Sequence, residues 1–174
     1  HIDENLCFNS ISPLKDVDGL NALTFGNMSM GKPLFFSATP LAIISLLKYY
    51  NISLTSKNVV VIGRSRILGK PLAMMLLNEN ATVTVCHSYT KDIEIICKKA
   101  DVIVGAIGKT HYVQPSWIKK GVVLIDAGYN KDNKGDIDPE CFKKSIAYTP
   151  VPGGVGPVTI IKLLEQVVTA KIES

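Results

Sequence analysis

The stretch Val59–Pro71, which reads VVVIGRSRILGKP, decides the fold expected of this chain. Its four consecutive apolar residues predict a buried parallel strand that ends at Gly63. Gly69 then precedes Lys70-Pro71 and an apolar helical pattern. A strand that turns through glycine into a helix directs free backbone N–H groups toward one point, which suits a phosphate. The stretch therefore predicts a strand–turn–helix unit with a phosphate site.

The turn departs from the dinucleotide-binding pattern G-x-G-x-x-G, because Ser65 occupies the position of the middle glycine. Arg64 and Arg66 place two cations where the phosphates of a nucleotide would lie. The alternative is a turn that merely joins a strand to a helix. The nucleotide interpretation therefore depends on the rest of the chain.

Runs rich in β-forming residues alternate with helical patterns in the second half of the chain. The expected strands are Asn58–Ile62, Thr82–Cys86, Asp101–Ala106 and Val122–Asp126. The expected helices are Gly69–Asn78, Lys91–Lys99 and a short turn of helix at Pro115–Ile118, and Lys131–Gly135 is expected to be an exposed polar loop. This alternation predicts an α/β fold: a Rossmann-like, doubly wound, mainly parallel sheet with flanking helices.

Two further helices are expected to flank this sheet. Thr39 as the N-cap and Pro40 at the first helical position predict a helix that continues through Leu41–Tyr50. Pro157 opens a long amphipathic pattern. Its predicted buried side carries Ile160, Ile161, Leu163, Leu164, Val167 and Val168.

The composition is that of a globular chain. Of 174 residues, 47% are hydrophobic and 20% are charged. Since no apolar run approaches the roughly 18 residues that span a bilayer, we expect a soluble protein without a membrane partner. The net charge of +4 comes from dispersed lysines, which favour an anionic ligand over nucleic acid.

Four scattered cysteines, none in a C-x-x-C pair, indicate free thiols in a reducing compartment. The first residues lack the basic start and apolar core of a signal peptide. We therefore expect a cytoplasmic location, with a mitochondrion or another organelle as the open alternative. With three histidines in the chain, no metal site is expected.

The end of the second expected strand indicates which nucleotide is bound. NAD-specific domains have an acidic residue there, whereas Thr82–Cys86 runs into His87-Ser88-Tyr89-Thr90. The Ser88 hydroxyl and the Arg64 guanidinium favour a 2′-phosphate, because arginine binds phosphate through two parallel hydrogen bonds. The cofactor is therefore expected to be NADP rather than NAD. The alternative is that both are ordinary surface residues.

Four other segments are candidates for ligand contact. Glycines follow the third and fourth strands, where they either approach a nicotinamide ribose or only form tight turns. In Lys15–Gly19 (KDVDG), a carboxylate is a natural acceptor for the N–H donors of an amino-pyrimidinone edge, although an exposed turn is the alternative. Thr149–Pro157 (TPVPGGVGP) predicts a rigid loop that contacts a ligand or a second domain.

With these segments together, the chain resembles the bifunctional methylenetetrahydrofolate dehydrogenase/cyclohydrolase family over essentially all 174 residues. The matching motifs are KDVDG at Lys15–Gly19, TP at Thr39-Pro40, GRS and GKP within Gly63–Pro71, ATVTVCHS at Ala81–Ser88, GDID at Gly135–Asp138 and, most specifically, TPVPGGVGPVT at Thr149–Thr159.

The resemblance implies two α/β domains with a folate cleft between them and an NADP-binding Rossmann domain on the C-terminal side. It implies that Gly63, Arg64 and Ser65 hold the cofactor phosphates, with Ser88 at the 2′-phosphate and Tyr129 beside the nicotinamide. Asp18 would bind the pterin. The folate site would be lined by Pro152, Gly153, Gly154, Val155 and Gly156.

The implied chemistry is hydride transfer from 5,10-methylenetetrahydrofolate to NADP, followed by attack of water on the methenyl carbon to yield 10-formyltetrahydrofolate. The family's Tyr-x-x-x-Lys pair lies upstream of the position of His1, so no catalytic residue is expected in this chain. Residues 1–38 are expected to remain from an N-terminal domain, and residues 39–174 to form the Rossmann domain, whose last helix returns to that domain. The fragment is expected to bind NADP and part of the folate without turnover.

The resemblance also implies tetrahydrofolate derivatives, the absent N-terminal domain and a second copy of the chain as partners. The chain departs from the family's usual residues at Ala38 (cysteine), Tyr129 (isoleucine) and Val158 (methionine). Two alternatives remain open: another Rossmann oxidoreductase of the shikimate- or amino-acid-dehydrogenase type, and a non-catalytic nucleotide-binding module.

Overall fold

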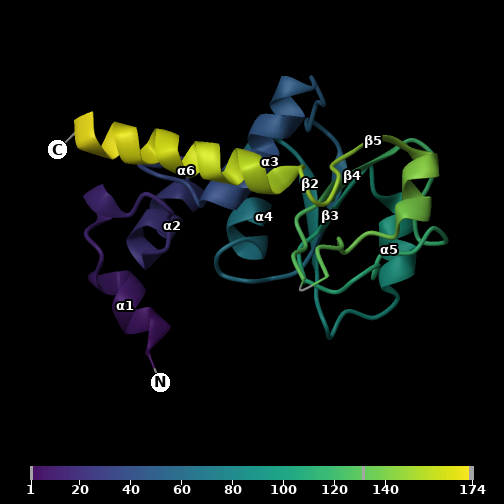
Figure 1. Cartoon of the computed structure of the whole chain (residues 1–174), viewed down its shortest axis with the longest axis horizontal. Helices are drawn as coiled ribbons and strands as arrows, with labels where there is room; N and C mark the ends of the chain where they lie inside the picture. Colours follow the sequence, from purple (N-terminus) through teal and green to yellow (C-terminus); the bar gives the residue numbers. More distant parts are fainter. Residues whose placement is uncertain (1, 131, 173–174) are drawn as a thin grey trace.

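A parallel sheet lies at the centre of the computed structural model, which describes residues 2–130 and 132–172 (Figure 1). In this part of the chain the strands follow the order β2-β1-β3-β4-β5, and every pair of neighbours is parallel. The strands are β1 (Asn58–Ile62), β2 (Thr82–Cys86), β3 (Val102–Gly105), β4 (Val122–Asp126) and β5 (Ser145–Tyr148). The predicted α/β fold class is confirmed.

The continuous apolar runs of the central strands supply two cores, one on each face of the sheet. Because successive side chains of a strand point to opposite faces, Val61 joins one core while Ile62 joins the other. β3 and β4 are buried along their whole length. The edge strands β2 and β5 alternate between exposed and partly buried residues, except that β2 ends in the buried Cys86. This burial pattern is typical of a sheet covered on both faces.

Helices cover both faces of the sheet. One core contains residues of α3 (Ala38–Tyr49), of α4 (Gly69–Asn78) and of the start of α6 (Val155–Ile172). The other contains residues of α5 (Ile93–Lys99) and of η2 (Pro139–Lys144), a 3₁₀ helix. The N-terminal elements α1 (Glu4–Ser10), η1 (Pro13–Lys15) and α2 (Ala22–Ser29) lie on the left of Figure 1, and α2 contributes the buried Met28 to the first core.

Most element predictions hold to within two residues. The third strand is shorter than Asp101–Ala106 by one residue at each end, and α5 begins at Ile93 rather than Lys91. The expected helical turn at Pro115–Ile118 is wrong, because the chain makes a non-helical turn there. β5, α2 and the 3₁₀ helices were not predicted. The expected polar loop at residues 131–135 includes residue 131, which lies outside the described residues.

The N-terminus of α3 differs from the prediction. Ser37, not Thr39, is the N-cap residue, and its side chain makes no capping hydrogen bond. The Asp18 carboxylate instead accepts a hydrogen bond from the N–H of Ala38, the first residue of the helix, at 2.9 Å. A capping group 20 residues upstream gives no signal in the local sequence.

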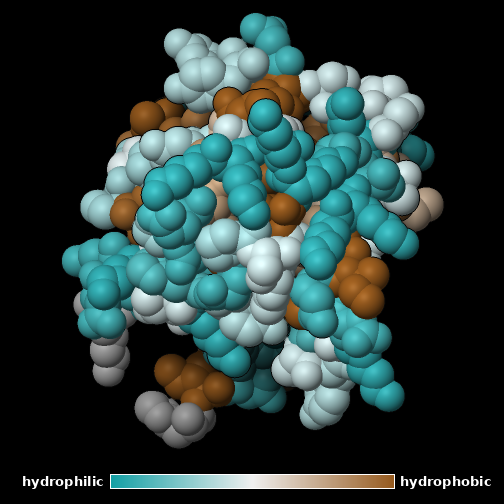
Figure 2. Space-filling model, turned by 90° about the vertical axis from the view of Figure 1, so that its right-hand side faces the viewer, coloured by the Kyte–Doolittle hydropathy of each residue, from teal (hydrophilic) through white to brown (hydrophobic). Residues whose placement is uncertain are grey.

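α6 begins at Val155, two residues before the predicted start at Pro157. Its predicted buried side is wrong, because the apolar side chains along it are largely exposed: Ile160 63%, Ile161 54%, Leu164 59%, Val167 46% and Val168 60%. The helix packs on α3 and projects beyond the sheet (Figure 1). Figure 2 shows the opposite end of the molecule, where hydrophilic side chains dominate.

The four cysteines are free, as predicted, and Cys86, Cys97 and Cys141 are buried. Burial raises the pKa of Cys97 to about 12 and that of Cys141 to about 11, so both pack as neutral thiols. Among the helices described, none combines the length and the apolar character needed to cross a membrane.

We expect Asp101→Asn to lower the free energy of unfolding by about 0.5–1 kcal/mol at pH 7. The Asp101 carboxylate accepts hydrogen bonds from Lys119 Nζ (2.6 Å) and the Asn58 N–H (2.8 Å), which lower its pKa. Because the folded-state pKa is lowered, this stabilisation is present above the unfolded pKa of about 3.9 and is lost as the pH falls through the folded value.

Urea unfolding at pH 7 and at pH 2.5 checks this prediction, with the exposed Asp132→Asn as the matched control. The difference between Asp101→Asn and the unsubstituted chain should be smaller at the lower pH. An equal difference at both pH values would contradict the assignment.

Candidate functional site

The turn after β1 packs closely against the end of β3. Gly63 has a φ of +131°, and a Cβ at this position would collide with the carbonyl oxygen of Ala106. A Cβ at Gly69 would in turn collide with the carbonyl oxygen of Gly63. Both glycines of the opening motif are therefore required by close backbone approach.

Ser65 organises this turn. Its hydroxyl oxygen accepts hydrogen bonds from the N–H groups of Leu68 (3.2 Å) and Gly69 (3.3 Å), and its carbonyl accepts one from the Lys70 N–H at 3.0 Å. The serine thus caps the start of α4 while its own hydroxyl proton remains available to a ligand. This contact explains a serine in place of the middle glycine.

A cavity of about 210 Å³ lies at the carboxyl ends of β1, β2 and β3. It is lined by Ile62, Gly63, Arg64, His87, Ser88, Ile93, Ile107, Lys109 and Tyr112. The structure thus brings Gly63, Arg64 and Ser88 together, as expected, and adds Lys109. Lys109, which follows a glycine at the end of a strand, was not considered from sequence.

A tight turn presents Ser88 to this cavity. His87 Nδ1 accepts a hydrogen bond from the Tyr89 N–H (3.2 Å), and Thr90 Oγ1 accepts one from the His87 N–H (2.9 Å). The Arg64 guanidinium lies 5.7 Å from the centre of the Tyr89 ring. Two cations and a hydroxyl therefore surround a space without a carboxylate among its lining residues, which suits a phosphate.

Arg66 points elsewhere. Its Nη1 donates a hydrogen bond to Asn5 Oδ1 at 2.6 Å, and its guanidinium lies 4.9 Å from the centre of the Phe8 ring. The two arginines of the turn therefore differ: Arg64 faces the cavity beside Ser88, and Arg66 joins the turn to α1.

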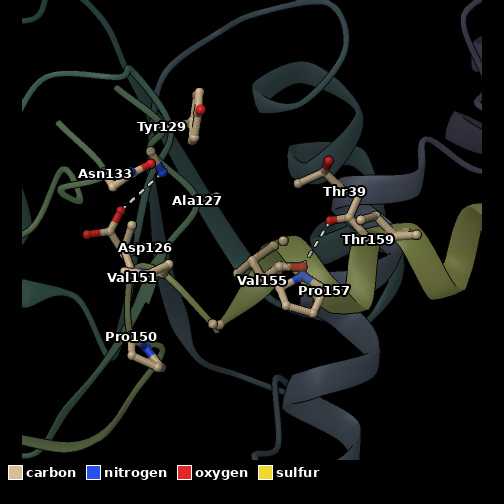
Figure 3. Close-up of a pocket in the computed structure, with 16 residues that line it drawn as sticks. Thr39, Asp126, Ala127, Tyr129, Asn133, Pro150, Val151, Val155, Pro157 and Thr159 are labelled. Carbon is tan, nitrogen blue, oxygen red and sulfur yellow. Dashed lines mark hydrogen bonds between the residues drawn. The ribbon is translucent and has the colours of Figure 1, made fainter. Parts of the chain in front are cut away.

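A larger cavity of about 580 Å³ lies between the end of β4 and the start of α6 (Figure 3). The structure brings Tyr129 together with Pro152, Gly153, Gly154, Val155 and Gly156 in its lining. Thr149 Oγ1 accepts a hydrogen bond from the Asp126 N–H (2.8 Å), which joins the Pro- and Gly-rich loop to β4. The lining is mainly apolar, as in many small-molecule sites.

Asp18 does not line this cavity, but it lies close to it in the chain's hydrogen bonding. Asp18 caps Ala38, and the next residue, Thr39, lines the cavity. Gln166 of α6 fixes Val17, the residue before Asp18, because its Nε2 donates a hydrogen bond to the Val17 carbonyl at 2.8 Å. Burial raises the pKa of the Asp18 carboxyl, an effect that the Ala38 N–H opposes.

Two buried carboxylates that were not predicted, Asp126 and Asp136, lie where β3 and β4 end. Burial raises the pKa of Asp126, and hydrogen bonds from three backbone N–H groups oppose this shift. Within residues 2–130 and 132–172, His, Cys, Asp and Glu form no group of three or more suited to a metal ion.

Gly63, Arg64 and Ser88 lie at the carboxyl ends of neighbouring parallel strands, which is where Rossmann-like domains bind nucleotides. This arrangement defines the class: a Rossmann-like nucleotide-binding domain. The family model described as tetrahydrofolate dehydrogenase/cyclohydrolase, NAD(P)-binding domain, matches residues 37–174. The chain therefore belongs to the tetrahydrofolate dehydrogenase/cyclohydrolase family.

Relatives agree with this assignment. The bifunctional protein FolD of Cellvibrio japonicus is 54% identical over 166 residues, which cover 95% of this chain and 59% of that protein. The crystal structure of the FolD dehydrogenase/cyclohydrolase from Campylobacter jejuni has a TM-score of 0.96 and 44% identity, covering 100% of this chain and 64% of the other.

The FolD structure from Trypanosoma brucei, complexed with NADP cofactor and inhibitor, has a TM-score of 0.93 and 37% identity, covering 99% of this chain and 63% of the other. The chain thus spans about three fifths of the length of these relatives. The predicted family and the NAD(P)-binding domain are confirmed, and the shikimate-type and non-catalytic alternatives are not favoured.

Proposed function

We propose that this chain is the NADP-binding part of a 5,10-methylenetetrahydrofolate dehydrogenase/5,10-methenyltetrahydrofolate cyclohydrolase. The observation that carries the proposal is the cavity shared by Arg64 and Ser88 at the ends of β1 and β2. Its lining offers a guanidinium and a hydroxyl, and no carboxylate that would compete with a 2′-phosphate. These donors fit NADP better than NAD.

In this proposal Gly63, Arg64 and Ser65 hold the cofactor phosphates, Ser88 binds the 2′-phosphate, and Tyr129 lies beside the nicotinamide. We add Lys109 as a second cation near the 2′-phosphate, because it lines the same cavity as Arg64. When bound, NADP supplies the hydride acceptor. The side chains around the cofactor bind it and orient its nicotinamide.

Residues Pro152–Gly156 are proposed to line the folate site, and Asp18 to accept hydrogen bonds from the pterin. The cavity of about 580 Å³ supports this assignment, because it joins Pro152–Gly156 to the loop of Tyr129. A methylene bridge held there would lie near the nicotinamide for hydride transfer. Attack of water on the resulting methenyl carbon would then yield 10-formyltetrahydrofolate.

We further propose that the apolar face of α6 packs against an N-terminal domain, to which residues 1–38 belong, while residues 39–174 form the Rossmann domain. The exposed Ile160, Leu164 and Val168 support this, because side chains of this kind are normally buried. The catalytic Tyr and Lys would come from that domain. A homodimer and a cytoplasmic location complete the proposal, and the free thiols are consistent with a reducing compartment.

Titration of the 174-residue chain with NADPH and NADH tests the cofactor proposal. We expect NADPH to bind more tightly, and no turnover of methylenetetrahydrofolate with NADP. Addition of an N-terminal domain from a relative should restore both reactions. Equal affinity for the two nucleotides would contradict the NADP assignment, and turnover by the chain alone would contradict the proposed source of the catalytic residues.

With that domain supplied, Asp18→Asn is expected to raise the KM for methylenetetrahydrofolate about tenfold, because a charged hydrogen-bond acceptor for the pterin is lost. The asparagine oxygen can still accept the Ala38 N–H, so α3 keeps its cap. Asp92→Asn, an exposed substitution of the same kind, is the control. An unchanged KM in Asp18→Asn would refute the pterin contact.

A further inference from the structure

Two of the most buried polar side chains lie at the ends of β3 and β4. Asp126 is 2% exposed and Asp136 is 0% exposed. Neither carboxylate forms a salt bridge among those recorded for the described residues. Both are satisfied by backbone N–H groups, which shows that their function is tied to the shape of the chain around them.

The Asp136 carboxylate accepts hydrogen bonds from three successive backbone N–H groups after β3. Its Oδ2 accepts hydrogen bonds from the N–H groups of Ile107 (2.7 Å) and Gly108 (3.2 Å), and its Oδ1 accepts one from the Lys109 N–H at 2.7 Å. Successive N–H groups that converge in this way form an anion-binding concavity. In this protein the concavity is filled by the protein's own carboxylate.

Asp126 holds Asp136 in place. Its Oδ1 accepts hydrogen bonds from the N–H groups of Gly128 and Asp136, both at 3.0 Å, and its Oδ2 accepts one from Ile137 at 2.9 Å. The end of β4 therefore orients the backbone of Asp136, and Asp136 orients the end of β3.

Glycines make room for both carboxylates. A Cβ at Gly128 would collide with the Asp136 carboxyl group, and a Cβ at Gly135 would collide with that of Asp126. The glycines in the segments Asp126-Ala127-Gly128 and Gly135-Asp136 thus have a common structural reason.

The segments that these carboxylates fix are the walls of both cavities. Ile107 and Lys109 line the cavity that contains Arg64. Asp126 and Tyr129 line the larger cavity, in which Asp126 lies beside the loop that carries Ala127 and Tyr129 (Figure 3). A shift of either carboxylate would therefore move residues that face the nucleotide.

We propose that Asp136, held by Asp126, is a positioning residue that fixes the 107–109 loop for NADP. By occupying the N–H groups of that loop, it directs the cofactor phosphates to the turn that carries Arg64. The inference rests on the proposed function, because it needs NADP in the crevice. Since the N–H groups after β3 already bind a carboxylate, a phosphate finds no free donors there and meets a like charge. The free donors remain on the side of β1, with Arg64 and Ser88.

Asp136→Asn tests the inference in the full 174-residue chain. The amide can accept through only one oxygen, and its NH₂ group faces an N–H donor of the loop. We expect the Kd for NADPH to rise about tenfold and exchange of the 107–109 amide hydrogens to accelerate. Asp138→Asn, two residues along, is the matched control, because the Asp138 side chain caps η2 and lines neither of the two cavities described above.

A merely structural role would lower stability without changing affinity in the folded chain. The Kd is therefore measured where urea unfolding shows each variant to be folded, with the α3 core truncation Leu47→Ala as a stability control. An unchanged Kd in folded Asp136→Asn would overturn the inference and leave the proposed function intact. Failure of the unsubstituted chain to bind NADPH would overturn both.

If Asp136→Asn does not fold, hydrogen exchange in the unsubstituted chain tests whether the 107–109 loop is fixed by Asp136. The amides of Ile107, Gly108 and Lys109 should be strongly protected, although Gly108 and Lys109 are exposed. Exchange at the rate of an open loop would overturn the inference.

Discussion

Arg64→Ala is expected to weaken NADPH binding about a hundredfold and to change NADH binding by less than about threefold. Arg64 and Ser88 share one cavity, and a guanidinium binds a 2′-phosphate through two charge-assisted hydrogen bonds. NADH lacks that phosphate, so its affinity should change little. Fluorescence titration of the two reduced nucleotides measures both constants.

Arg66→Ala is the matched control for this prediction. It removes the same kind of side chain from the same turn, but the Arg66 guanidinium is bound to Asn5 and lies over Phe8. Its effect on the NADPH to NADH preference should be small. Equal losses for NADPH and NADH in Arg64→Ala would show that Arg64 binds the pyrophosphate and not the 2′-phosphate.

Gly63→Ala is expected to lower the free energy of unfolding by about 3 kcal/mol or more and to abolish NADPH binding. The added Cβ would collide with the carbonyl of Ala106, and the φ of +131° is a conformation that L residues rarely adopt. Relief of the clash must separate the ends of β1 and β3, which carry the nucleotide cavity. Urea unfolding and NADPH titration measure the two effects.

Gly26→Ala is the control substitution in α2. A Cβ there meets nothing within 4 Å, so replacement of a helical glycine is expected to raise the free energy of unfolding by about 0.5–1 kcal/mol. Similar destabilisation by both substitutions would mean that close approach to Ala106 is not the cause.

The central strands were predictable because each is a short apolar run buried on both faces, and such a run is visible in the sequence itself. β5 was missed because its four residues are half exposed and carry no continuous apolar signal. The buried side of α6 was mispredicted for a related reason. Amphipathic spacing reports which residues form an apolar face and does not report what covers that face.

The candidate site was likewise predictable from the sequence only in part. Arg64, Ser88 and the Pro- and Gly-rich loop were identifiable from local motifs, and the structure places Arg64 and Ser88 together. Lys109 and the link between Asp126 and Asp136 join segments distant in the chain, so no local pattern contains them.

Local sequence patterns were enough to predict the family, the βα architecture and the nucleotide-binding turn, because these depend on residues close together along the chain. Three features became visible in the folded chain alone: Asp18 caps α3, the apolar face of α6 is exposed, and two buried carboxylates bind the backbone that follows β3 and β4. No local pattern reports these features, because polar groups are satisfied and apolar groups are buried by whichever groups the fold brings near, whatever their separation in sequence.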